Sequence, residues 1–233
     1  MKSRLRPVRS RHRSLYQDAL CDRFHKLYYD SRIWERTRWL GTPVQKLPLD
    51  LWLFQELIVE LRPDLIIETG TFAGGSALFY ASVMDALGDG HIVTVDIDAD
   101  PARPTHPRVE YITGASTDSQ VVDQVRARAE SAERVMVILD SDHTKEHVLG
   151  EIHAYAPLVT LRSVLIVEDT DINGHPVDPH FGPGPMEAVL EFLAGTVDFT
   201  LDRDLERRFF VAFHPRGYLR RTSNSSRPEQ AES

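Results

Sequence analysis

The 233-residue sequence predicts an α/β protein built on a Rossmann-like, doubly wound, mostly parallel sheet. From residue 65 onward, short runs of apolar residues alternate with longer helical patterns, as expected for strands covered by helices on both faces. Hydrophobic residues make up 42% of the chain, enough for a sizeable core at this length. Both observations favour one large domain.

The predicted strands and helices follow in a regular order. Strands are expected at 65–68, 91–96, 109–113, 135–140 and 164–168, with further runs at 199–202 and 209–213. Helices are expected at 75–87, 119–132, 144–158 and 185–193. The last two strands, joined by the charged turn 203–208, are expected to form an antiparallel hairpin at the sheet edge.

A helical region precedes the predicted sheet. Residues 15–40 mix aromatic and charged side chains, which predicts one or two amphipathic helices, and another helical pattern follows Pro48 and ends before Pro63. We therefore divide the chain into a basic arm with a helical segment (1–45), a main domain (46–220) and a disordered tail rich in Ser, Pro and Glu (221–233).

The charge distribution limits the classes of partner. The net charge is −8, and it is −14 without the first thirteen positions, six of which are basic. Such a chain is not expected to bind nucleic acid through its phosphates. No apolar stretch reaches the roughly 20 residues that span a bilayer, and no apolar segment typical of a signal peptide follows the basic start. With Cys21 as its single cysteine, the chain is expected to be cytoplasmic.

The first two strand ends indicate a cofactor site, because ligands of such sheets lie beyond the carboxyl ends of the strands. Strand 65–68 ends in Glu68 and leads through Gly70 and Gly74 into a helix, without the G-x-G-x-x-G or P-loop pattern, so neither NAD nor ATP is favoured. Asp96 ends the next strand, 28 residues after Glu68, where a carboxylate would bind a ribose diol. The alternative is that these acids only cap helices.

The next two strand ends indicate a metal site. Asp140 and Asp142 follow one strand, and Glu168 and Asp169 end the other. Carboxylates side by side in a crevice repel one another unless a cation neutralises them, and Mg²⁺ is the hard divalent ion expected there. The alternative is that some of them cap helices or pair with the nearby basic side chains of Lys145 and Arg162.

His143 is the candidate general base. It lies three residues after Asp140, and the ordinary histidine pKa of about 6.5 suits removal of a proton from an acidified hydroxyl. Structural roles are expected for five other histidines: His106, His147, His153, His175 and His214.

Five ordered motifs resemble the cephalosporin hydroxylase family, which also contains rhamnosyl and other sugar O-methyltransferases. The matching segments are 49–52, 63–76, 138–143, 167–170 and 181–188. The resemblance implies a class I methyltransferase fold, S-adenosylmethionine and a magnesium ion. By similarity to metal-dependent sugar O-methyltransferases of macrolide pathways, it also implies that Asp140, Glu168 and Asp169 bind Mg²⁺ and that His143 is the base. Asp142 has no counterpart in that pattern.

The resemblance also guides the assignment of the remaining site residues. The residues assigned to the cofactor are Glu68, Thr69, Gly70, Thr71, Gly74, Ser76, Asp96, Ser116 and Asp140. The acceptor is expected to be a mannoside or rhamnoside of a polysaccharide, glycolipid or natural product, with loop 181–186 on the substrate side. Asp50, Trp52 and the N-terminal aromatic residues are expected to cover the site. The apolar surface of residues 16–39 predicts a homo-oligomer.

Two other functions stay open at this point. The basic arm and the aromatic segment would suit a non-catalytic binding or assembly module on a methyltransferase fold. The family name would suit an oxygenase, but non-haem iron usually takes two histidines and one carboxylate, whereas the predicted site has one histidine among several acids.

Overall fold

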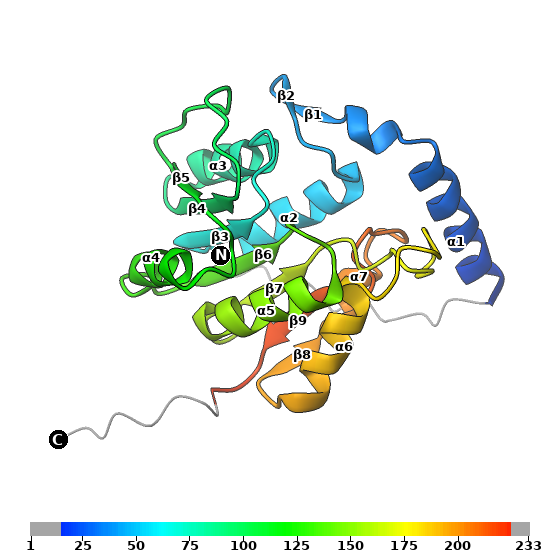
Figure 1. The fold of residues 1–233 in the computed structure, drawn as a ribbon. Helices are drawn as coiled ribbons and strands as arrows, with labels where there is room; N and C mark the ends of the chain where they lie inside the picture. The colour runs from blue at the N-terminus through cyan, green and yellow to red at the C-terminus, as the bar shows by residue number, and fades with distance from the viewer. Residues whose placement is uncertain (1–14, 225–233) are drawn as a thin grey trace, which may run out of the picture.

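A seven-stranded sheet with strand order β5-β4-β3-β6-β7-β9-β8 forms the centre of the computed structural model, which describes residues 15–224 (Figure 1). Strands β3 to β7 are parallel, whereas β9 runs antiparallel to both β7 and β8. The strands are β3 (Leu65–Thr69), β4 (His91–Asp96), β5 (Val109–Thr113), β6 (Val135–Leu139), β7 (Val164–Val167), β8 (Phe199–Leu201) and β9 (Tyr218–Arg221). This topology confirms the predicted fold class.

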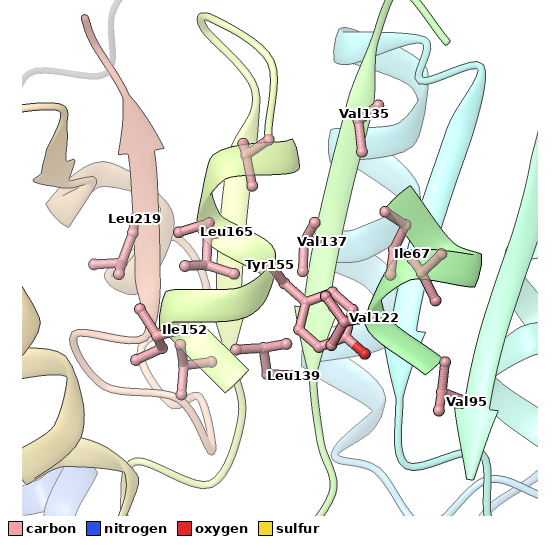
Figure 2. Packing of buried hydrophobic residues seen from close by; sticks show 14 of the residues in the cluster. Ile67, Val95, Val122, Val135, Val137, Leu139, Ile152, Tyr155, Leu165 and Leu219 are labelled. Carbon is pink, nitrogen blue, oxygen red and sulfur yellow. The ribbon is translucent and has the colours of Figure 1, made fainter. Parts of the chain in front are cut away.

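Helices cover both faces of the sheet because the central strands are apolar on both sides. The helices are α2 (Pro48–Leu61), α3 (Gly75–Leu87), α4 (Ser119–Ala129), α5 (Lys145–Tyr155), α6 (Pro185–Gly195) and the short α7 (Arg203–Glu206). Val137 and Leu139 of β6 pack with α4, α5 and α6, and Figure 2 shows Ile152 and Tyr155 of α5 over this face. Met136 and Ile138, which alternate with them, pack with α2 and α3 on the other face.

The C-terminal edge differs from the prediction. Residues 209–213 form no strand, and the partner of β8 in the antiparallel pair is β9. Val211 and Phe213 are buried, as an apolar run should be, but they pack against the N-terminal helix rather than in the sheet. The predicted turn 203–208 contains α7, and β9 includes Arg221, one residue beyond the expected end of the main domain.

The N-terminal helix α1 (Leu15–Asp30) lies at the edge of the molecule, beside the loop that follows β7 (Figure 1). The 3-10 helix η1 (Ile33–Arg36) and a small hairpin of β1 (Arg38–Trp39) and β2 (Thr42–Pro43) connect α1 to α2; a second 3-10 turn, η2 (Ala156–Leu158), extends α5. The basic arm and most of the predicted tail lie outside the described residues. Among residues 15–224, no helix combines the length and apolar character that a bilayer crossing requires.

Candidate active site at the carboxyl edge of the sheet

A cavity of about 760 Å³ opens at the carboxyl edge of the parallel strands. The loops after β3, β4, β5, β6 and β7 line it, together with the N-terminal segment. Six of the nine residues assigned to the cofactor line this cavity: Gly70, Thr71, Ser76, Asp96, Ser116 and Asp140. The strand-end rule therefore locates the cavity correctly.

Glu68 lies beneath the glycine turn rather than on the cavity surface. It is fully buried, and its Oε2 accepts a hydrogen bond of 2.6 Å from the Thr94 hydroxyl. Its Oε1 has no partner within the described part of the chain. Burial raises the pKa of Glu68 to about 7. Thr69 and Gly74, also assigned to the cofactor, likewise do not line the cavity.

The turn after β3 approaches the loop after β6 closely enough to require glycine. Gly70 has φ +82°, and a Cβ atom there would lie 1.7 Å from the carbonyl oxygen of Asp140. The Asp140 N–H in turn donates to the carbonyl of Thr69. The glycine thus allows the turn after β3, which we call the cofactor turn, to pack against Asp140 at the carboxyl edge of the sheet.

Asp96 lies on the cavity and also holds its own loop. Its carboxylate accepts hydrogen bonds from the N–H groups of Phe72 (2.8 Å) and Asp98 (2.9 Å), and it lies 3.2 Å from the guanidinium of Arg103. These N–H groups belong to loop residues, so Asp96 does not cap a helix as the alternative expected. Its lining position leaves it available to a ligand as well.

Asp140, His143 and Asp169 converge beside the cavity. One donor atom from each lies within 4.8 Å of the others, and His143 Nε2 is 3.4 Å from both Asp140 Oδ1 and Asp169 Oδ2. Asp169 has φ +51°, a left-handed conformation that costs a non-glycine residue roughly 1–3 kcal/mol. The strand ends thus bring together two of the three predicted metal ligands and the predicted base.

Lys46 is a central residue of the site that sequence reasoning missed. Its Nζ lies 2.6 Å from Asp140 Oδ2 and 2.6 Å from Glu168 Oε2, and its side chain is 4% exposed. Glu168, the third predicted metal ligand, thus pairs with Lys46 through Oε2, while its Oε1 is buried without a hydrogen-bond partner among residues 15–224. The clustered acids indicated a need for positive charge, for which we expected a metal ion or basic side chains nearby in the sequence. The basic partner is instead Lys46, from the segment before the sheet, whereas Lys145 pairs with Glu191.

The charges of the cluster compensate one another. Burial lowers the pKa of Lys46, but Asp140 and Glu168 together raise it well above its usual value. Burial raises the pKa of Asp140, yet Lys46 and His143 bring it down to about 2. Burial lowers the pKa of His143, whereas Asp169 and Asp140 raise it to about 9. Near neutral pH, two cationic side chains therefore face ionised Asp140.

The donor set fits a divalent cation. Carboxylate oxygens are the protein ligands that Mg²⁺ prefers, and opposite ligands of that ion lie about 4 Å apart, close to the 4.8 Å spread of this cluster. His143 Nε2 is buried and has no well-aligned hydrogen bond in the described structure. A cation held by Asp140 and Asp169 would lie beside this imidazole nitrogen.

A second buried polar group lies beneath Glu168. The carboxylate of Asp50 on α2 accepts a hydrogen bond of 2.9 Å from the N–H of Phe213, and His214 Nε2 lies 3.4 Å from Asp50 and 3.8 Å from Glu168. Burial raises the pKa of Asp50 to about 8 and lowers that of His214 to about 3, so both are uncharged near neutral pH.

The residues expected to cover the site fall into two groups. Asp50 is buried, and Trp52 is 60% exposed with its indole N–H on Glu56, so neither lines the cavity. Tyr29 and Trp34 of the N-terminal segment do line it. The sequence alone does not separate the two groups, because Tyr29 and Trp34 reach the cavity only through the packing of the N-terminal segment on the main domain.

Asp142 and the remaining histidines of the site have partners of their own. The Asp142 carboxylate accepts the N–H of Thr144 at 2.7 Å, just before α5. His147 lies 3.1 Å from the Ser116 hydroxyl, and His175 Nε2 lies 2.8 Å from Glu187. These contacts agree with the structural roles expected for the two histidines.

Comparisons with known proteins agree with this arrangement. A family model described as rhamnosyl O-methyltransferase/CmcI matches residues 31–222. A rhamnosyl O-methyltransferase of Mycobacterium tuberculosis strain H37Rv is 38% identical over 208 residues, covering 87% of this chain and 85% of the relative. One from Mycobacterium leprae is 39% identical over 210 residues, covering 87% and 90%.

Solved structures share the fold. The apo structure of CmcI superposes with a TM-score of 0.63 at 21% identity, covering 82% of this chain and 78% of that one. A CmcI structure described as Mg-SAM gives 0.63 at 20% identity, covering 81% and 78%. A putative caffeoyl-CoA O-methyltransferase from Staphylococcus aureus gives 0.58 at 17% identity, covering 90% and 100%. These likenesses confirm the class I methyltransferase fold.

Proposed function

The chain belongs to the rhamnosyl O-methyltransferase/CmcI family, and from that membership we propose that it is an S-adenosylmethionine- and magnesium-dependent O-methyltransferase acting on a sugar hydroxyl. The observation that carries the proposal is the cluster of Asp140, His143 and Asp169 beside the cavity. The relatives' name favours a rhamnoside as acceptor, and a mannoside is the second class we propose.

We place the cofactor along the loops after β3, β4 and β5. Gly70 and Thr71 bring main-chain groups to the cavity wall, and the Asp96 carboxylate lies where a ribose diol would be bound. Ser116, in the loop after β5, lines the same cavity. S-adenosylmethionine bound there would supply the methyl group.

The proposed cation site is formed by Asp140 and Asp169, while Glu168, the third expected ligand, pairs with Lys46 through Oε2 and has no hydrogen-bond partner for Oε1 among the described residues. When bound, Mg²⁺ would supply positive charge that offsets the carboxylates and makes a nearby acceptor hydroxyl more acidic. Lys46 holds Asp140 through one carboxylate oxygen and leaves Oδ1, the oxygen nearest His143, toward the cluster. The protein thereby fixes the orientation of the first ligand before any cation arrives.

His143 is the proposed general base. Its Nε2 lies 3.4 Å from both Asp140 and Asp169, which orient the imidazole and, without a cation, raise its pKa to about 9. The positive charge of bound Mg²⁺ would offset these carboxylates and lower the pKa of His143, so that a neutral imidazole could take the hydroxyl proton. Methyl transfer is an in-line displacement, so the rest of the rate enhancement comes from alignment of the acceptor oxygen with the methyl group. The oxygenase alternative finds little support here, because one imidazole and two carboxylates differ from the usual iron-binding set.

The assay that tests this function uses the purified full-length chain with labelled S-adenosylmethionine, Mg²⁺ and a panel of p-nitrophenyl rhamnosides and mannosides. We expect label in the glycoside and loss of transfer after EDTA, restored by added Mg²⁺. Retention of full activity in EDTA would remove the magnesium requirement. Absence of both cofactor binding and methyl transfer would contradict the enzyme reading and favour a binding module.

A further inference from the structure

The cavity that holds the metal cluster is also lined by aromatic side chains, which we call the aromatic wall. Tyr29, Trp34 and Phe213 line it together with Ile172 and Phe181, and the same cavity contains His143 and Asp169. Two of these residues, Tyr29 and Trp34, come from the segment before the methyltransferase sheet. Gly70 and Thr71, from the turn after β3 assigned to the cofactor, line the same cavity.

The aromatic wall is held in place by contacts with the main domain. His25 Nε2 of α1 lies 2.7 Å from Asp171 Oδ2, and burial lowers the pKa of His25 to about 4, so this is a buried hydrogen bond near neutral pH. The His25 ring also stacks on Phe213, with centroids 5.5 Å apart and planes 16° apart. Because His25 lies one helical turn before Tyr29, this contact sets where the lining residues lie.

Tyr29 and Trp34 support each other within the wall. Their rings stack with centroids 5.8 Å apart, and the Trp34 indole N–H donates to the Tyr29 carbonyl at 3.1 Å. Phe213 meets the Trp34 ring edge-on at 6.1 Å. An indole fixed by three contacts presents its surface at little entropic cost to a ligand.

The Tyr29 hydroxyl is placed to bind a polar group. Burial, and after it the negative charges of Asp171, Asp169 and Asp178, raise the pKa of Tyr29 to about 12, so its hydroxyl keeps its proton near neutral pH. Within the described residues the hydroxyl makes no hydrogen bond that would occupy it. The wall therefore combines an apolar ring surface with an available O–H group beside the reactive cluster.

This combination matches one class of ligand. A pyranose has C–H groups gathered on one face, which pack on an aromatic ring, and hydroxyls at its rim, which need directed hydrogen bonds. A free aliphatic chain would leave the Tyr29 hydroxyl unpaired, at the cost of a buried polar group.

We propose that Tyr29 and Trp34 form the acceptor subsite, with the sugar ring packed on Trp34 and one of its hydroxyls bound by the Tyr29 O–H, next to His143. The proposal rests on the proposed function and adds the residues that select the acceptor. The N-terminal segment is then part of the active site rather than an appendage.

The test compares Trp34→Ala and Tyr29→Phe with the wild type, using p-nitrophenyl α-L-rhamnopyranoside and the matching mannoside. We expect KM for the glycoside to rise about tenfold or more in Trp34→Ala and about threefold to tenfold in Tyr29→Phe. KM for S-adenosylmethionine should stay within about twofold in both, because neither Tyr29 nor Trp34 belongs to the loops after β3, β4 and β5 where we place the cofactor. Saturation-transfer NMR of the glycoside reports binding without turnover.

Matched controls come from the same chain. Tyr28→Phe removes a hydroxyl from the neighbouring residue of α1, which packs on Phe213 but does not line the cavity. Trp52→Ala removes an indole from the exposed face of α2. Both should behave as the wild type.

The outcomes separate this proposal from the proposed function. If the wild type methylates a glycoside and Trp34→Ala does so with the same KM and the same NMR signal, the subsite is overturned while the function stands. If the wild type neither binds nor methylates either glycoside, both proposals are overturned. A variant that loses cofactor binding together with its thermal transition is misfolded, and the milder Tyr29→Phe then decides.

Discussion

Lys46 and His143 give the acidic site its electrostatic balance at the scale of single residues. Lys46 contacts two carboxylates at 2.6 Å, and His143 lies 3.4 Å from two. Asp140 belongs to both groups, so its two oxygens face different cations. Replacing His143 should therefore lower turnover, whereas replacing Lys46 should lower stability.

Replacement of His143 by alanine should affect turnover more than binding. We expect kcat to fall by about 10²–10⁴, the usual contribution of a general base, with little change in the affinity for S-adenosylmethionine. Single-turnover methyl transfer and calorimetry measure the two quantities. His153→Ala, an exposed position on α5, is the control. Near-normal kcat in His143→Ala would assign the proton to another group.

Replacement of Lys46 by methionine should destabilise the protein. Removing one partner of a buried ion pair typically costs about 3–5 kcal/mol, because the remaining charge is left unpaired in the interior. Urea unfolding should show this loss, and Glu168→Gln in the same chain should restore part of it. Lys145→Met breaks an exposed pair with Glu191 and should change little. Equal effects of the two lysine substitutions would refute the buried-pair account.

The site could be predicted from the sequence as far as strand ends reach. Asp140, Asp169, His143 and Asp96 follow strands, so the parallel topology alone brings them to one edge. Lys46, Tyr29 and Trp34 could not be found this way, because they come from segments that precede the sheet. Their positions depend on tertiary docking, which leaves no periodic signal.

At the scale of elements, tertiary docking also explains why the predicted strand 209–213 does not form. Apolar periodicity identified β3 to β8 and α2 to α6 within a few residues, because each buries a repeating face. The run 209–213 has equally apolar residues, but Phe213 packs on α1 and its N–H binds Asp50. An apolar run shows that a segment is buried and does not show which partner buries it.

Asp50 connects three of these elements and should make stability depend on pH. Burial raises its pKa from 3.8 to about 8, so the folded chain keeps a proton that the unfolded chain releases above pH 4. Unfolding therefore becomes easier as pH rises from about 4 to about 8. Asp50→Asn lacks this titration, so its free energy of unfolding should not fall in this way. The difference in free energy of unfolding, variant minus wild type, should therefore increase as pH rises from about 4 to about 8.

Denaturant unfolding of both proteins at several pH values between 4 and 8 measures the difference. Asp204→Asn, an exposed position on α7, is the control and should track the wild type. A constant difference between Asp50→Asn and the wild type at all pH values would show that Asp50 is ionised in the folded chain.

At the scale of the whole molecule, α1 carries a stripe of exposed apolar side chains on its outer side. Leu20, Phe24 and Leu27 are 55%, 48% and 68% exposed, while Cys21, His25 and Tyr28 on the adjacent stripe pack inward. We propose that a second copy of the chain covers the outer stripe, giving a homo-oligomer. An exposed apolar stripe beside a packed one is typical of an interface.

Light scattering coupled to size-exclusion chromatography tests this assembly. Leu20→Glu with Phe24→Glu should lower the molar mass to that of one chain while leaving the thermal transition in place. Val197→Glu, 75% exposed beside β8, should leave the mass unchanged. A wild type that elutes as a single chain would contradict the prediction.

The left-handed backbone at Asp169 shows where selection for function and selection for stability diverge. A glycine there would adopt φ +51° without the conformational penalty, yet it would remove a carboxylate from the cluster. A search for thermostable variants should therefore find gains at this position that are paid for in turnover. The backbone conformation at Asp169 is therefore a cost in stability that the protein bears to keep this carboxylate in the cluster.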